Sequence, residues 1–202
     1  MVKFPSFIHG IIIGVLLSDG WVRLQQKNRS INGCLHFKQS VAHSQYVWFV
    51  FNILSHYCPS LPFLVTGTRA GVRNYGLEFY TRSLPCITEI YHLFYPNGVK
   101  AIPQNIYELL SPAALAHLIM GDGTASRSGL VLCTNSFSLP DVVRLMNVLM
   151  IRYGLECTIH LKRRQNQKIE YLIYIKQCSM PLLRSIVKRY MTPSMYYKIN
   201  GK

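Results

Sequence analysis

The sequence predicts an α+β protein made of two related halves, residues 1–100 and 101–202. An apolar helical run that ends in a small residue, Asp and Gly occurs twice, at 10–20 and at 113–123. The same order of strand and helix patterns follows each copy. The strand patterns alternate apolar and polar residues, which indicates sheets with one buried and one open face. Each half is therefore predicted to run helix, strand, strand, helix, strand, strand, helix.

The first of these helices is the longest apolar run of the chain, at 7–17. It has about half of the ~20 residues that a membrane-spanning helix needs. It resembles a signal peptide, but it ends in Ser18-Asp19-Gly20 and has no small-residue cleavage site. We therefore expect a buried helix of the mature protein and no membrane partner.

The remaining elements follow in the same order in both halves. In the first half we predict a strand ending at Lys38-Gln39-Ser40, a helix at 43–57, strands at 61–69 and 72–81, and a helix at 85–94. In the second half, Thr134-Asn135-Ser136 precedes a helix at 140–153, strands at 155–163 and 169–176, and a helix at 180–190. A lysine closes each half, Lys100 in the first and Lys198 in the second.

Composition limits the partners of this fold. The chain has 202 residues, half of them apolar and 12% aromatic, which excludes intrinsic disorder. Lys and Arg number 22 against 8 Asp and Glu, a net charge of +14, so a folded basic surface should face nucleic acid or an anionic membrane. The six cysteines form no C-x-x-C pair, which argues against zinc and redox motifs and predicts buried free thiols in a reducing compartment.

Long polar side chains occur at every second position of several predicted strands. This spacing lets an antiparallel ribbon reach bases and phosphates in a DNA major groove. The alternative is an ordinary solvated sheet face. The candidate DNA-binding residues are Arg23, Gln25, Lys27, His36, Lys38, Arg69, Arg73, His160, Lys162 and Arg164.

The repeated Asp residues are the candidate catalytic groups. Asp occurs three times, and Asp141 follows Ser138 at the spacing of a capping box, which predicts a structural role. Asp19 and Asp122 instead end the two repeated helices, where an acid opposes the helix dipole. An Asp-Gly turn that merely closes a helix is common, but two copies in register, each with a lysine downstream, favour chemistry.

Small residues also recur every four positions in the repeated helices: Gly10, Gly14 and Ser18 in one, Ala113 and Gly121 in the other, with His117 between them. Such stripes let helices pack closely, which would bring the carboxylates of Asp19 and Asp122 together. Paired carboxylates repel unless they share protons or a metal. Mg²⁺ would suit this site and support phosphodiester hydrolysis, with Lys100 and Lys198 stabilising charge on the phosphate.

These segments resemble a known family. Gly-Val-Leu-Leu-Ser-Asp-Gly (14–20) and His-Leu-Ile-Met-Gly-Asp-Gly (117–123) resemble the paired signature helices of LAGLIDADG homing endonucleases in their single-chain form. The stretches 100–105, 110–112, 132–137 and 195–198 resemble the mitochondrial omega-intron endonuclease group most closely. His117 departs from the small residue usual at its place, and we interpret it as a partly buried core histidine.

The resemblance implies two pseudo-twofold-related αββαββα repeats whose antiparallel sheets form a saddle over a long, asymmetric DNA site, with the motif helices at the centre. It implies a monomer that binds Mg²⁺, with Mn²⁺ as a substitute, through Asp19, Asp122 and the carbonyl oxygens of Ser18 and Gly121. It implies cutting of both strands across the minor groove with short 3′ overhangs, and a mitochondrial, organelle-encoded origin.

Four further residues acquire roles from the resemblance. Lys100 and Lys198 match the basic residues of the family's active site, and Gln39 and Asn135 are expected at equivalent positions, where they would orient water or phosphate.

Three functions without DNA cutting compete with this interpretation. Some family members are maturases that bind their host intron RNA. A sequence-specific DNA-binding protein without catalysis and a structural basic protein would also account for the positive charge. Loss of an acid would favour a function without cutting. Both acids are present, so we favour an endonuclease.

Overall fold

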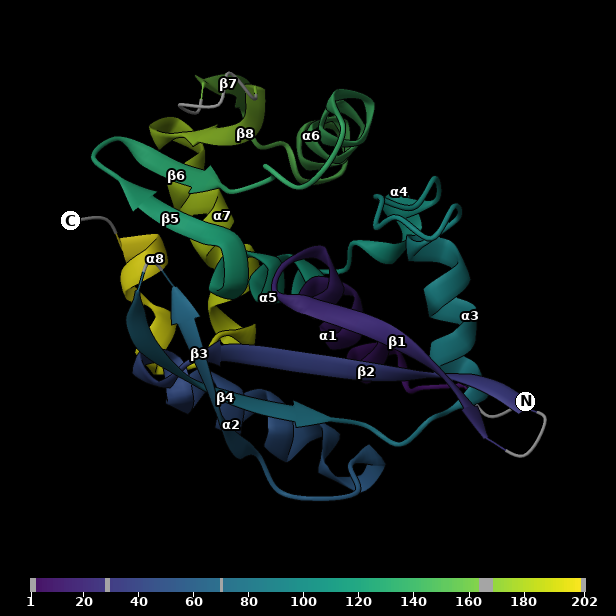
Figure 1. The fold of residues 1–202 in the computed structure, drawn as a ribbon. Coiled ribbons are helices and arrows are strands. Elements are labelled where there is room, and N and C mark those ends of the chain that lie inside the picture. The colour runs from purple at the N-terminus through teal and green to yellow at the C-terminus, as the bar shows by residue number, and fades with distance from the viewer. Residues whose placement is uncertain (1–2, 28–29, 70, 164–168, 201–202) are drawn as a thin grey trace.

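The protein is described by a computed structural model, which covers residues 3–27, 30–69, 71–163 and 169–200 (Figure 1). The helices in these ranges are α1 (Ser6–Leu17), α2 (Ser44–Leu54), α3 (Pro85–Phe94), α4 (Ile106–Leu109), α5 (Pro112–Asp122), α6 (Leu139–Tyr153), α7 (Met180–Val187) and α8 (Tyr197–Asn200). The strands are β1 (Gly20–Lys27), β2 (Ser30–Ser40), β3 (Phe63–Arg69), β4 (Val72–Tyr80), β5 (Gly123–Ser126), β6 (Gly129–Leu132), β7 (Cys157–Arg163) and β8 (Ile169–Lys176).

The strands form two antiparallel sheets with the same topology. The orders are β1-β2-β4-β3 and β5-β6-β8-β7, so each sheet is built from one half of the chain. The predicted α+β class and the repeated order of elements are confirmed. The sheets lie on either side of the central helices α1 and α5 (Figure 1).

Glycines set the close packing of α1 against α5. A Cβ added to Gly14 would lie 2.3 Å from the backbone oxygen of Ala114 and 2.6 Å from the Cβ of His117. A Cβ on Gly121 would lie 2.3 Å from the Oγ of Ser18. Since both contacts leave no room for a methyl group, the predicted stripe of small residues is the interface between the two helices.

Each sheet buries one face, as the alternation predicts. In the first sheet, Val22, Leu35, Phe37 and Phe79 point to the core and are at most 6% exposed. The second sheet contributes Leu130, Leu132, Ile173 and Ile175 to the same hydrophobic cluster, which extends through both halves. The two halves therefore share one continuous core.

Several boundaries differ from the sequence prediction. Helices α4 and α8 have four residues each and are too short to give a periodic apolar pattern. The predicted helix at 180–190 ends at Val187 and continues as a 3-10 turn, Lys188–Tyr190. Strands β5 and β6 also have only four residues each, so Thr134-Asn135-Ser136 lies in a turn after β6 rather than in a strand.

The starts of corresponding helices α2 and α6 differ in chemistry. Ser138 caps α6 by accepting a hydrogen bond from the Asp141 backbone N–H, and its hydroxyl also donates to the Asp141 carboxylate at 2.7 Å. This confirms the structural role predicted for Asp141. The residue before α2 is His43, whose side chain makes no capping hydrogen bond.

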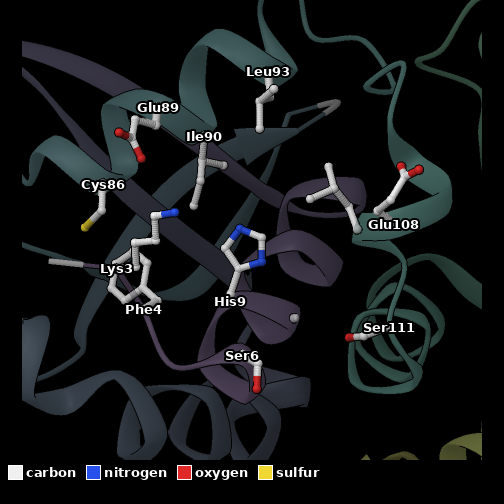
Figure 2. Close-up of a pocket in the computed structure, with 12 residues that line it drawn as sticks. Lys3, Phe4, Ser6, His9, Cys86, Glu89, Ile90, Leu93, Glu108 and Ser111 are labelled. Carbon is white, nitrogen blue, oxygen red and sulfur yellow. The ribbon is translucent and has the colours of Figure 1, made fainter. Parts of the chain in front are cut away.

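All six cysteines are free thiols, but the predicted burial holds only for Cys34, Cys58 and Cys157, since Cys86 and Cys133 are half-buried and Cys178 is exposed. In the part of the chain that the structure describes, no helix has the length and apolar character required to cross a membrane. A hollow of about 460 Å³ lies beside the start of α1, between α3 and the segment that leads into α5, and His9 points into it (Figure 2). This hollow is at the opposite end of α1 from Asp19.

His117 is a core residue, as interpreted from the sequence. It is 1% exposed, its Nδ1 lies 3.1 Å from the Tyr46 hydroxyl, and its ring stacks on Phe49 at 6.0 Å between centroids. Burial lowers the pKa of His117 to about 3. The folded state therefore keeps the imidazole neutral, and Tyr46 links α2 of the first half to α5 of the second.

We predict that this burial makes stability sensitive to acid. The unfolded chain protonates His117 below a pKa of about 6.5, whereas the folded protein does not do so until about 3. His117 therefore contributes a fall of up to about 1.4 kcal/mol per pH unit to the free energy of unfolding as the pH drops below 6.5. Asp122, whose pKa is raised to about 7 in the folded state, contributes a change of the opposite sign in this range, so the effect of His117 is read from the difference between the wild type and a His117 variant. Urea unfolding at several pH values between 7 and 4 measures this slope.

The slope of the free energy of unfolding against pH should be less positive in His117→Leu than in the wild type, by up to about 1.4 kcal/mol per pH unit, because this variant has no imidazole to protonate. The Tyr46 hydroxyl would keep its second acceptor, the backbone oxygen at position 117, at 3.3 Å. His56→Gln is the matched control, since His56 is exposed and should leave the slope unchanged. Equal slopes in wild type and His117→Leu would contradict the prediction.

Candidate active site

The two repeated carboxylates meet where α1 and α5 end. Asp19 follows α1 and is exposed, whereas Asp122 is the last residue of α5 and is half-buried. The Oδ2 of Asp19 lies within 3.0 Å of the place that a Cβ on Gly121 would occupy, directly beside Asp122. Burial, followed by the charge of Asp19, raises the pKa of Asp122 to about 7, while Lys100 and Lys198 oppose this rise. The predicted convergence of the two acids is present.

Each lysine binds the end of the motif helix of its own half. The Nζ of Lys100 donates to the backbone oxygens of Ser18 at 2.9 Å and Gly20 at 2.8 Å. The Nζ of Lys198 donates to those of Met120 at 2.5 Å and Gly121 at 2.7 Å. A cation at a helix C-terminus is favourable, so the lysines offset the unfavourable placement of the acids.

Burial also affects the lysines themselves. It lowers the pKa of Lys100 to about 8 and lowers that of Lys198, while the charges of both Asp residues act in the opposite direction. Lys198 is only 6% exposed, and the short helix α8 positions it. The site thus has two carboxylates and two ammonium groups in close electrostatic contact.

The donor set suits a hard divalent cation. Two carboxylates meet here, and the backbone oxygens of Ser18 and Gly121 lie at the same helix ends, where they accept hydrogen bonds from Lys100 and Lys198. Mg²⁺ prefers oxygen ligands and keeps several waters. Among the described residues, no group of three or more His, Cys, Asp or Glu side chains could hold a metal ion. A Mg²⁺ or Mn²⁺ ion held by two carboxylates and backbone oxygens would complete its coordination with water and substrate oxygens.

Gln39 and Asn135 lie in different surroundings. The Nε2 of Gln39 donates to the Oδ2 of Asp19 at 2.5 Å, so Gln39 belongs to the carboxylate centre. Asn135 lies in a hollow with Lys100 instead. The strand register explains the difference: Phe37 pairs with Gly20 and Leu132 with Gly123. Two residues after Phe37 is Gln39, and two residues after Leu132 is Thr134, so Thr134 is the counterpart of Gln39. The expected equivalence of Asn135 and Gln39 is not found.

Several of the candidate DNA-binding residues lie on the open sheet faces. Arg23, Gln25, His160 and Lys162 are exposed, and the alternation places them opposite the core. Lys38 is half-buried in a hollow with Asp19 and Gln39. The side chains of Lys27 and Arg69, and all of Arg164, lie outside the described residues.

Two of the candidates are placed differently from the expectation. Arg73 is exposed, but it shares the side of β4 on which Leu77 and Phe79 point to the core, because the pairing of β3 with β4 contains no bulge. His36 faces the open side, yet its Nδ1 contacts a Glu78 carboxylate oxygen at 3.1 Å and its ring stacks on Trp21. Its Nε2 is buried, so His36 does not present a free donor to DNA.

Sequence reasoning missed two further residues that line the site. His43 and Tyr197 line a hollow of about 460 Å³ together with Asp122, Cys133 and Lys198. The Nε2 of His43 lies 3.4 Å from the Tyr197 hydroxyl. The signal available in the sequence was the position of Tyr197 next to Lys198.

Comparison with known proteins agrees with this architecture. The model of the LAGLIDADG DNA endonuclease family matches residues 9–183, which include both Asp-Gly motifs and all the described strands of both sheets. The chain therefore belongs to the LAGLIDADG DNA endonuclease family, in the single-chain form with two motifs.

Several relatives illustrate the range of this family. The chain is 32% identical to the cytochrome b mRNA maturase bI2 of Debaryomyces hansenii, over 95% of this chain and 72% of that protein. It is also 32% identical to the maturase of the same name from Saccharomyces cerevisiae, over 96% of this chain and 47% of that protein. It is 40% identical to an intron-encoded endonuclease of Dictyostelium discoideum, over 62% of this chain and 77% of that protein.

A solved structure shares the whole fold. The homing endonuclease I-WcaI, bound to its DNA recognition sequence, superimposes with a TM-score of 0.86 over all of this chain and 89% of that chain, at 23% sequence identity. This likeness shows the fold of the chain.

Proposed function

We propose that the chain is an intron-encoded homing endonuclease that acts as a monomer with internal pseudo-twofold symmetry. It hydrolyses both strands of a long, asymmetric DNA target and leaves short 3′ overhangs. The observation that carries the proposal is the meeting of Asp19 and Asp122 at the ends of α1 and α5, each with a lysine of its own half. A binding protein without catalysis has no use for two acids whose charges repel.

The carboxylates and the backbone oxygens of Ser18 and Gly121 would hold Mg²⁺ or Mn²⁺. A bound divalent cation supplies an activated water and neutralises charge that develops on the phosphate. Gln39 orients the Asp19 carboxylate through its hydrogen bond, which leaves the other carboxylate oxygen free to accept. Lys100 and Lys198 bring fixed positive charge to the place where phosphate must bind.

Arg23, Gln25, His160 and Lys162 extend this charge along the open faces of the two sheets. Half or more of protein–DNA hydrogen bonds go to phosphate and sugar and fix the register of the duplex. Long donors spaced every second residue suit this task. The acids then lie between two DNA-binding faces, at the centre of the bound target.

Selection from a DNA library tests the activity and defines the target together. The purified chain is incubated with duplexes that contain randomised sequence, in Mg²⁺, Mn²⁺ or EDTA, and fragments with 3′ overhangs are captured and sequenced. We expect enrichment of one long, asymmetric site with either metal and none with EDTA. Recovery of bound but uncut duplexes in every condition would establish a binding protein without catalysis.

Binding to this target should depend steeply on salt. If the basic faces make six to ten phosphate contacts, affinity should fall roughly 1,000-fold or more between about 50 and 200 mM salt. Fluorescence anisotropy with a labelled target in EDTA measures the slope of log K against log salt. A flat response would contradict phosphate binding by the sheet faces.

A second candidate function is assistance to intron splicing. Two relatives at 32% identity are named cytochrome b mRNA maturases, and a basic surface can also bind structured RNA. Splicing of the host intron RNA in the presence of the chain tests this role independently of DNA cutting. A mitochondrial, organelle-encoded origin accords with relatives of this kind.

A further inference from the structure

The two halves of the active site are surrounded by different side chains. Lys198 lies in a hollow with His43 and Tyr197, and Lys100 lies in a hollow with Val99, Ser138 and Asn135. Besides the two lysines, two pairs of lining residues occupy corresponding positions in the repeated order of elements. His43 and Ser138 both immediately precede the helix that packs under their sheet, and Tyr197 and Val99 both immediately precede the lysine.

The paired positions have unlike chemistry. Ser138 is engaged in capping α6 through Asp141, and Val99 is an apolar side chain that is 72% exposed. His43 makes no capping contact, because it ends the 3-10 turn Val41–His43 that leads into α2 and that Ser40 caps. Instead its ring turns to Tyr197, which belongs to the other half of the chain.

His43 lies beside Asp122 and Lys198, in the hollow that they line. Burial is the largest influence and lowers its pKa; the charge of Lys198 acts in the same direction and that of Asp19 in the opposite one. Charged groups of both halves therefore influence His43. Tyr197, whose hydroxyl His43 contacts, is 52% exposed and lines the hollow.

We propose that His43 is a positioning residue that holds the Tyr197 hydroxyl beside Lys198, where this hydroxyl donates to the phosphate of one DNA strand only. The inference rests on the proposed endonuclease function. The hollow around Lys100 has Val99 where the other has Tyr197, so the second strand receives no such donor. The two strands are therefore cut by chemically different centres and at different rates.

The test measures the two strands separately. A duplex with the selected target carries a different fluorophore on each strand, and single-turnover cutting in Mg²⁺ gives one rate constant per strand. In His43→Leu and in Tyr197→Phe we expect one strand to be cut about tenfold more slowly, the effect of losing roughly 1.4 kcal/mol of transition-state hydrogen bonding. The rate for the other strand should change less than about twofold, so nicked DNA accumulates.

Three variants separate positioning from a structural effect. His43→Gln can still reach the Tyr197 hydroxyl with its amide and should restore most of the strand rate. Val99→Ala, at the related position of the other hollow, should change neither rate. Ser138→Ala removes a genuine cap and should lower the melting temperature without changing the ratio of the strand rates.

Two results would overturn the inference. One is an equal slowing of both strands in His43→Leu and Tyr197→Phe, and the other is no slowing of either strand. If Asp122→Asn abolishes cutting while the His43 and Tyr197 variants keep the wild-type strand ratio, the inference fails and the proposed function stands. If the wild-type chain cuts no selected DNA, the proposed function itself fails.

Discussion

Asp19→Asn and Asp122→Asn should each abolish double-strand cutting, with a loss of roughly 1,000-fold or more, as expected when a charge that stabilises the transition state is removed. Asn keeps the size of the side chain and loses the negative charge that a divalent cation needs. DNA affinity in EDTA should be unchanged or slightly higher, because the phosphate contacts remain and one repulsive charge is gone. Gel shift and plasmid cutting with the selected target measure the two properties.

The same variants should fold at least as stably as the wild type. Asp19 and Asp122 repel each other across the helix ends, and this repulsion contributes to the raised pKa of Asp122. A melting temperature equal to or above that of the wild type would show that lost activity is not lost folding.

Asp141→Asn is the matched control, since it changes the third Asp of the chain. Its carboxylate contacts Ser138 and forms an ion pair with Arg144 at 2.8 Å. We expect full cutting and a loss of stability of less than about 1 kcal/mol. Unimpaired double-strand cutting by both Asp19→Asn and Asp122→Asn would refute the catalytic assignment.

Gly14→Ala should destabilise the protein by about 3 kcal/mol or more, because the added methyl group would overlap backbone rather than a flexible side chain. Its Cβ would lie 2.3 Å from the Ala114 oxygen and 3.0 Å from the Ala114 carbonyl carbon. Relief of this overlap requires α1 and α5 to move apart, which would also separate Asp19 from Asp122. The free energy of unfolding, measured with urea at pH 7, and the rate of plasmid cutting should therefore both be lower than in the wild type.

Gly67→Ala is the control for this substitution. A Cβ at Gly67 in β3 would meet no heavy atom within 4 Å, so we expect a change in stability of less than about 1 kcal/mol. If Gly14→Ala were as stable as Gly67→Ala, the close packing of the motif helices would not be what holds the two acids together.

The sequence predicted the parts of this molecule that repeat. The stripe of Gly10, Gly14 and Ser18 against Ala113 and Gly121 defined the central interface, and the alternation along β2, β4 and β8 defined the buried faces. These features are periodic, so each position supports the interpretation of the next. The pairing of Asp19 with Asp122 followed because the packing brings the ends of both helices together.

What the sequence did not predict depends on local register and on contacts between distant segments. Asn135 was aligned with Gln39 by its place before a helix, but β6 ends at Leu132 and shifts the correspondence. Arg73 was assigned to the open face without knowing the pairing of β3 and β4. His43 and Tyr197 are 154 residues apart, and no periodic pattern connects them.

The contacts between halves also limit how this scaffold can be re-engineered. His43 of the first half contacts the Tyr197 hydroxyl of the second. The Tyr46 hydroxyl of the first half likewise contacts His117 of the second. An artificial homodimer of residues 1–100 would place a second Val99 where Tyr197 stands and a second Gly14 close to the place of His117. It would retain two acids and two lysines but would lose both cross-connections, so a symmetric enzyme derived from either half needs new residues at these positions.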